Sequence, residues 1–76
     1  MLSVKQPELG NLMRQLRINA GLTQEQFAAK LGVSFSTLNR WENGHSTPSP
    51  LAMQIIEQQA HQLGEGGQEL LKHLGK

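Results

Sequence analysis

The amino-acid sequence predicts an all-α fold, a compact bundle of four or five helices. Apolar residues recur every three or four positions in several segments, which is the spacing of one face of an α-helix. Residues with a strong capping preference, Thr23, Ser34 and Ser49, precede such segments. Glycines such as Gly21 and Gly32 follow them, and glycine readily adopts the left-handed conformation that ends a helix.

The first helix is predicted to begin near Pro7 and to stop at Gly21. Proline suits a first helical turn because no amide hydrogen is needed there. The apolar residues of this segment share one face: Leu9, Leu12, Met13, Leu16 and Ala20. We expect this stripe to cover the apolar side chains of the next two helices, which otherwise have no core to enter.

Two short helices with a bend between them are predicted within residues 23–44. Thr23 can cap the first with its hydroxyl while Gln26 reaches back to the Thr23 amide, which is a capping box. Gly32 suits a left-handed stop at the bend. Ser34 then offers the next N-cap, and Gly44 closes the second helix as Gly32 closes the first.

The second of these helices, about residues 35–43, is predicted to have two different faces. At about 100° per residue, Leu38 and Trp41 fall on the side of the core. Four polar residues cluster on the other side: Ser36, Asn39, Arg40 and Asn43. Short amides around a guanidinium suit base edges, because Arg pairs with guanine O6 and N7 and Asn pairs with adenine N6 and N7. The pattern predicts a helix that reads the major groove of double-stranded DNA.

Phe35 lies at the start of this helix, beside the polar face, and two alternatives are open for it. An exposed ring could touch a thymine methyl group, or the ring could pack down onto the preceding helix. Trp41 shares a face with Leu38, so a place in the core is favoured over stacking on a base.

The sequence Gly-Leu-Thr-Gln-Glu-Gln-Phe-Ala-Ala-Lys-Leu-Gly-Val-Ser at residues 21–34, followed by Trp-Glu-Asn-Gly at 41–44, resembles the Xre/Cro/C1 family. This is a helix-turn-helix family of phage and bacterial regulators with a lambda repressor-like DNA-binding domain. The resemblance covers about residues 8–63 and has specific details, such as Ala28 at the small position where the two helices cross. It implies phosphate contacts by Gln24 and Asn43, base contacts by Phe35, Ser36 and Arg40, and a structural ion pair between Arg17 and Glu42.

A fourth helix is predicted from Pro50, with Ser49 as its cap, to a stop near Gly64. Its apolar stripe is predicted to consist of Leu51, Ala52, Ile55, Ile56 and Leu63. After a glycine-rich break at residues 64–67, residues 68–74 form a predicted short helix with three leucines on one side. These leucines either complete a five-helix domain or form a contact with a partner. We expect residues 1–76 to form a single domain.

Length and charge limit how the chain can bind DNA. A chain of 76 residues supports one domain with a modest core. The net charge is only +1, divided as +2 over residues 1–50 and −1 over residues 51–76, so the half predicted to face DNA is the basic half. With so few cations per subunit we expect weak binding by a monomer, and therefore a homodimer or a partner that adds affinity.

Several classes of protein and site are disfavoured. Cysteine is absent, which excludes disulfides and thiolate zinc sites and fits the cytoplasm. No apolar run approaches the roughly 18 residues that span a bilayer, so no membrane association is expected. His45, His61 and His73 do not converge, and Glu57 with His61 offers only two metal ligands, so solvated surface is favoured. No catalytic motif is present, and we expect no enzyme, cofactor or metal.

The sequence therefore predicts a transcriptional regulator that binds double-stranded DNA with sequence specificity, as a homodimer. The alternative is an antitoxin that neutralises a toxin, or a bridging module, in which the same fold mainly binds protein.

Overall fold

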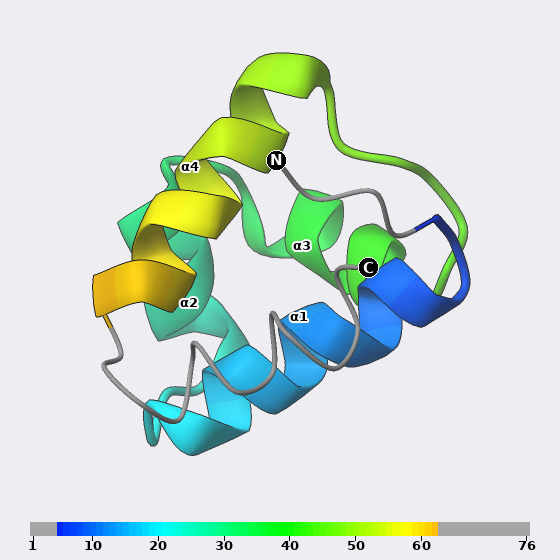
Figure 1. Cartoon of the computed structure of the whole chain (residues 1–76). Coiled ribbons are helices and arrows are strands. Elements are labelled where there is room, and N and C mark those ends of the chain that lie inside the picture. The colour runs from blue at the N-terminus through cyan, green and yellow to red at the C-terminus, as the bar shows by residue number, and fades with distance from the viewer. Residues whose placement is uncertain (1–4, 63–76) are drawn as a thin grey trace.

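The structure is a computed structural model, and it describes residues 5–62. Four α-helices and no strands occur in this range: α1 (Glu8–Asn19), α2 (Gln24–Leu31), α3 (Phe35–Glu42) and α4 (Pro50–Gln62) (Figure 1). The predicted all-α fold is confirmed. The predicted helix at residues 68–74 and the predicted core residue Leu63 lie outside the described residues.

The predicted caps are present at the start of α2 and at the bend between α2 and α3. The Thr23 hydroxyl accepts a hydrogen bond from the Gln26 amide at 3.1 Å, and the Gln26 side chain accepts one from the Thr23 amide at 2.9 Å. Gly32 has a φ of 74°, in the left-handed region, and the Ser34 hydroxyl accepts from the Thr37 amide at 3.1 Å. These contacts satisfy first-turn amides that have no partner within their own helix. The capping predictions are confirmed.

The start of α1 differs slightly from the prediction. The helix begins at Glu8, so Pro7 stands just outside it and has no side chain that could cap an amide. Gln6 supplies this cap instead, because its Oε1 accepts from the Gly10 amide at 2.8 Å. The Nε2 of the same side chain donates to the carbonyls of Trp41 (2.9 Å) and Ser46 (2.7 Å). Gln6 therefore ties the start of α1 to the end of α3.

One core holds the four helices together. Helices α1 and α2 both pack against α3, and α2 also packs against α4 (Figure 1). The predicted stripe of α1 is buried with the exception of Ala20, which is half-buried. The buried apolar residues are Leu9, Leu12, Met13, Leu16, Phe27, Ala28, Leu31, Leu38, Trp41, Ile56 and Ala60.

Gly10 permits a close approach of α1 to α3. A Cβ atom at this position would lie 2.6 Å from the carbonyl oxygens of both Trp41 and Glu42. These are backbone atoms, so they cannot move aside unless the helix itself shifts. Any larger residue would push the two helices apart. The end of α3 is therefore held at short distance from α1.

The apolar stripe of α4 is partly different from the prediction. Leu51 was expected in the core, and this is wrong, because 67% of its surface is exposed. It precedes Ile56 by five residues, which places it about 140° around the helix from the buried face. Ala60, four residues after Ile56, is buried in its place, while Ala52 and Ile55 are half-buried. None of the helices within residues 5–62 has the length and apolar character needed to cross a membrane.

Candidate nucleic-acid interface

Helix α3 divides into an outward face and a buried face. Ser36, Arg40 and Asn43 are exposed and Asn39 is half-buried, so the four polar residues predicted to lie together are at the surface. On the other side, Leu38 is fully buried and Trp41 is 7% exposed. The helix thus presents polar groups at the surface while its apolar residues join the core.

Phe35 and Arg40 are two of the exposed side chains of α3. Phe35 keeps 47% of its surface exposed, so its ring is not a core residue and has apolar area available for a ligand. Arg40 is exposed, and its guanidinium forms no hydrogen bond or ion pair with another residue of the described range. Its guanidinium is therefore free to donate to a bound molecule.

The buried carboxylate of Glu42 lies where α1, α2 and α3 meet. Only 3% of the residue is exposed. Arg17 Nε donates to Glu42 Oε2 at 2.9 Å, and Arg17 Nη2 donates to Oε1 at 3.2 Å. Gln24 Nε2 also donates to Oε1, at 3.2 Å. Both oxygens accept hydrogen bonds, as an ionised carboxylate does, and the residues implied by the resemblance as an ion pair are in contact.

Gln24, for which the resemblance implies a phosphate contact, is the first residue of α2, and its side chain reaches α3. Besides Glu42, its Nε2 donates to Asn39 Oδ1 at 3.2 Å. An amide NH2 group has two hydrogens, and both are directed at acceptors within the protein. The side-chain nitrogen of Gln24 therefore organises α3.

Asn43 and Arg14 form a second polar contact at the end of α3. Arg14 Nη2 donates to Asn43 Oδ1 at 3.1 Å and approaches the Glu42 carbonyl at 3.4 Å. Its Nε lies 3.7 Å from Glu42 Oε1, and 41% of its side chain remains exposed. Arg14 was not among the predicted contact residues. Its position three residues before Arg17, on the same side of a helix, was the available signal.

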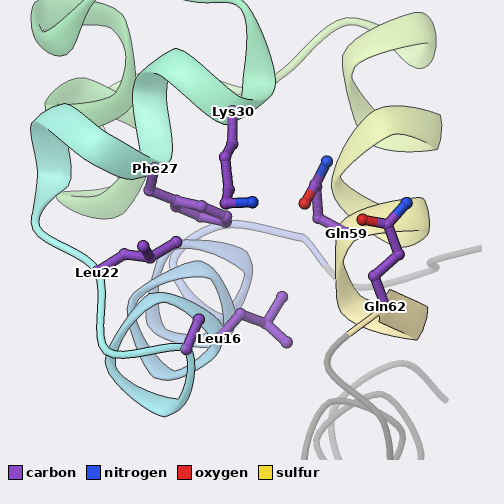
Figure 2. A pocket seen from close by; sticks show the side chains of 7 residues that line it. Leu16, Leu22, Phe27, Lys30, Gln59 and Gln62 are labelled. Atoms are coloured by element: carbon purple, nitrogen blue, oxygen red, sulfur yellow. The ribbon is translucent and has the colours of Figure 1, made fainter.

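A pocket of about 210 Å³ lies elsewhere, where α1, α2 and α4 meet (Figure 2). Leu16, Leu22 and Phe27 form its apolar wall, and Lys30, Gln59 and Gln62 bring polar groups from α2 and α4. None of the predicted DNA contacts lines this pocket. Within residues 5–62 there is also no group of three or more side chains that could hold a metal ion.

Comparison with known proteins identifies relatives of this chain. The sequence profile of a family described as helix-turn-helix matches residues 13–59. The chain is 40% identical over 50 residues to the propionyl-CoA carboxylase regulator of Cereibacter sphaeroides, covering 66% of this chain and 11% of that protein. It is 37% identical over 49 residues to the HTH-type transcriptional activator BcrR of Enterococcus faecalis, covering 64% of this chain and 24% of that protein.

These matches cover only a part of each relative, at most 24% of its length. No solved structure matches the chain significantly. The range matched by the family profile includes α2, the bend at Gly32, α3 and both members of the Arg17–Glu42 contact. The chain therefore belongs to the Xre/Cro/C1-type helix-turn-helix family of DNA-binding regulators.

Proposed function

We propose that this chain binds double-stranded DNA with sequence specificity, as a transcriptional regulator or the DNA-binding part of one, with α3 in the major groove. The observation that carries the proposal is the division of α3 into two faces. Leu38 and Trp41 are buried, while hydroxyl, amide and guanidinium groups reach the surface. A groove about 12 Å wide admits one helix, which would then contact bases through its outward side chains. These are Phe35, Ser36, Asn39 and Arg40.

Phosphate contacts are proposed at the start of α2 and at the end of α3. Asn43 with Arg14 would bind a phosphate at the end of α3, since Arg14 brings a partly exposed cation to the Asn43 amide. At the start of α2, the side-chain hydrogens of Gln24 are already directed at Asn39 and Glu42. Its contribution to phosphate binding is therefore proposed to come from main-chain amides of the first turn of α2, where helix N-termini attract anions.

The affinity of one copy should be low. The charge of Arg17 is compensated by Glu42, which leaves Lys5, Arg14, Lys30 and Arg40 as the remaining cations of the described range. Few phosphates can then be neutralised, and the electrostatic contribution to binding is small. We propose a homodimer that places two copies of α3 on half-sites about 10 to 10.5 base pairs apart, related by two-fold symmetry.

Selection of bound sequences from a random duplex pool tests the proposal. The expected result is a motif with two-fold symmetry. Arg40→Ala should cost about 1 to 3 kcal/mol of binding free energy and relax the preference at one base position in each half-site. Lys30→Ala, which removes a cation that lies on α2 beside the pocket, should retain the motif. A pool without enrichment would contradict DNA reading and favour the alternative, an antitoxin or bridging module that binds protein.

A further inference from the structure

A chain of hydrogen bonds leads from the core to the base-reading face, through Arg17, Glu42, Gln24 and Asn39. We propose that Gln24 holds the amide of Asn39 so that it presents only hydrogen-bond donors to DNA, and that Asn39 therefore selects guanine over adenine. The inference rests on the proposed function and specifies one of its base contacts. It differs from the expectation for a freely rotating asparagine, which pairs with adenine.

The ion pair between Arg17 and Glu42 sets the orientation of the Gln24 amide. The guanidinium of Arg17 has only donors, and it occupies both oxygens of the Glu42 carboxylate at 2.9 and 3.2 Å. An ionised carboxylate has only acceptors, so the Gln24 atom that lies 3.2 Å from Glu42 Oε1 must be the nitrogen. Exchanging the oxygen and nitrogen of Gln24 would bring two acceptors together beside a buried charge.

The orientation of the Gln24 amide in turn sets that of the Asn39 amide. The same Gln24 nitrogen lies 3.2 Å from the Asn39 side chain, toward which its second hydrogen points. Asn39 must therefore offer its oxygen, because a reversed amide would place two NH2 groups against each other. Asn39 is half-buried, and its oxygen is directed at Gln24. The Nδ2 group, with two hydrogens, is left for a ligand.

Guanine and adenine differ in the groups that they offer to such an amide. In the major groove guanine offers two acceptors, N7 and O6, whereas adenine offers the N7 acceptor and the N6 donor. Asparagine normally reads adenine by accepting from N6 and donating to N7 at the same time. With its oxygen held by Gln24, Asn39 would face the N6 amino group of adenine with another amino group. Guanine presents no such conflict.

The test compares guanine with adenine at the single position that Asn39 reads. Selection with the parent protein defines the motif, and Asn39→Ala identifies the position. Dissociation constants are then measured for duplexes that differ only there. We expect the parent to bind the guanine duplex at least about 5-fold more tightly than the adenine duplex, which is the lower end of the discrimination that a good base contact gives. In Gln24→Met, which removes both donors, Asn39 can rotate, and this ratio should fall to about one or invert.

A matched control separates this effect from a general loss of stability. Gln58→Met makes the same substitution at an exposed position of α4 and should retain the parent ratio. The preferences at other positions of the motif should be unchanged in Gln24→Met as well. A merely structural role of Gln24 would weaken binding to the guanine and adenine duplexes equally.

NMR spectra of the unliganded parent report the orientation without any substitution. With the Asn39 oxygen toward Gln24, cross-relaxation between the Asn39 Nδ2 hydrogens and the Gln24 Nε2 hydrogens should be weak. Strong cross-relaxation overturns the inference, as does an adenine preference in the parent or an unchanged ratio in Gln24→Met. If the parent enriches no motif, the proposed function fails and the NMR measurement still decides the orientation of the amide.

Discussion

The contact between Arg17 and Glu42 should be among the largest single contributions to stability in this domain. Glu42 has no exposed side-chain surface and Arg17 has 17%. In Arg17→Met the aliphatic part of the side chain is largely kept, but the buried carboxylate loses the donors at 2.9 and 3.2 Å. The charge then has no adequate partner, and such a loss typically costs about 3 to 5 kcal/mol.

The contacts that remain around Glu42 place the expected loss near the lower end of that range. Gln24 still donates at 3.2 Å, and Arg14 Nε lies at 3.7 Å, although the 41% exposure of the Arg14 side chain weakens its contribution through solvent screening. A folded chain of about this length has a total stability of roughly 4 to 11 kcal/mol. A loss of about 3 kcal/mol is therefore a large fraction of the total.

Equilibrium unfolding in urea, followed by the fluorescence of Trp41, measures this loss. Trp41 is the only tryptophan and is 7% exposed, so its emission reports the opening of the core. Arg40→Met is the matched control, because the Arg40 side chain is exposed and has no hydrogen-bond or ion-pair partner in the described range. It should change the free energy of unfolding by about 0.5 kcal/mol or less.

A double-mutant cycle tests the reasoning itself. Arg17→Met and Glu42→Met each leave a charge in the interior, whereas the double variant leaves none and fills the space with apolar groups. The double variant should therefore lose less stability than the sum of the two single variants, by roughly 0.5 to 3 kcal/mol. A double variant that loses at least the sum would refute the stabilising pair.

Three further substitutions test the packing and the caps. Gly10→Ala places a Cβ atom 2.6 Å from two carbonyl oxygens of α3, so it should lower the free energy of unfolding by about 1 to 3 kcal/mol. Asn11→Ala, at an exposed position of α1, should not lower it. Equal stability of the two variants in urea would contradict the close approach of the helices. Ser34→Ala removes the cap at the Thr37 amide and should cost about 1 kcal/mol by thermal unfolding; an unchanged midpoint would show that water replaces the hydroxyl. Ile56→Ala should lower the free energy of unfolding in urea by about 2 to 5 kcal/mol, whereas Leu51→Ala, at a residue with 67% exposure, should lower it little. The reverse order of the two losses would mean that the wrong face of α4 has been assigned to the core.

Much of the fold could be predicted because its determinants are local. The capping box of Thr23, the left-handed Gly32 and the Ser34 cap depend on residues within a few positions of each other, and all are present as predicted. The two faces of α3 follow from helical periodicity alone. The exposure of Leu51 could not be predicted in this way. Periodicity permits a wide apolar stripe on α4, and only the packing of α4 against α2 selects which part of that stripe is buried.

The candidate site shows the same division. The residue types on the outward face of α3 could be read from the sequence, and they indicate a surface that suits base edges. The bonds that orient those residues join positions 15 and 18 apart for Gln24, and 25 apart for Arg17 with Glu42. No local pattern specifies such pairs, because they depend on how close the helices approach one another.

Local residues alone specify the caps of α2 and α3, the apolar sides of α1 and α3 and the chemical groups that α3 offers, whereas the start of α1 and the buried part of α4 depend on contacts between helices. The tertiary structure decided how those groups are held. Helix α1 approaches α3 closely at Gly10, and the same pair of helices carries the contact between Arg17 and Glu42. The packing of α2 on α3 brings Gln24 to Asn39. The reason is physical: periodicity and capping act within one or two turns of a helix, whereas the direction in which a polar side chain donates depends on partners from other helices.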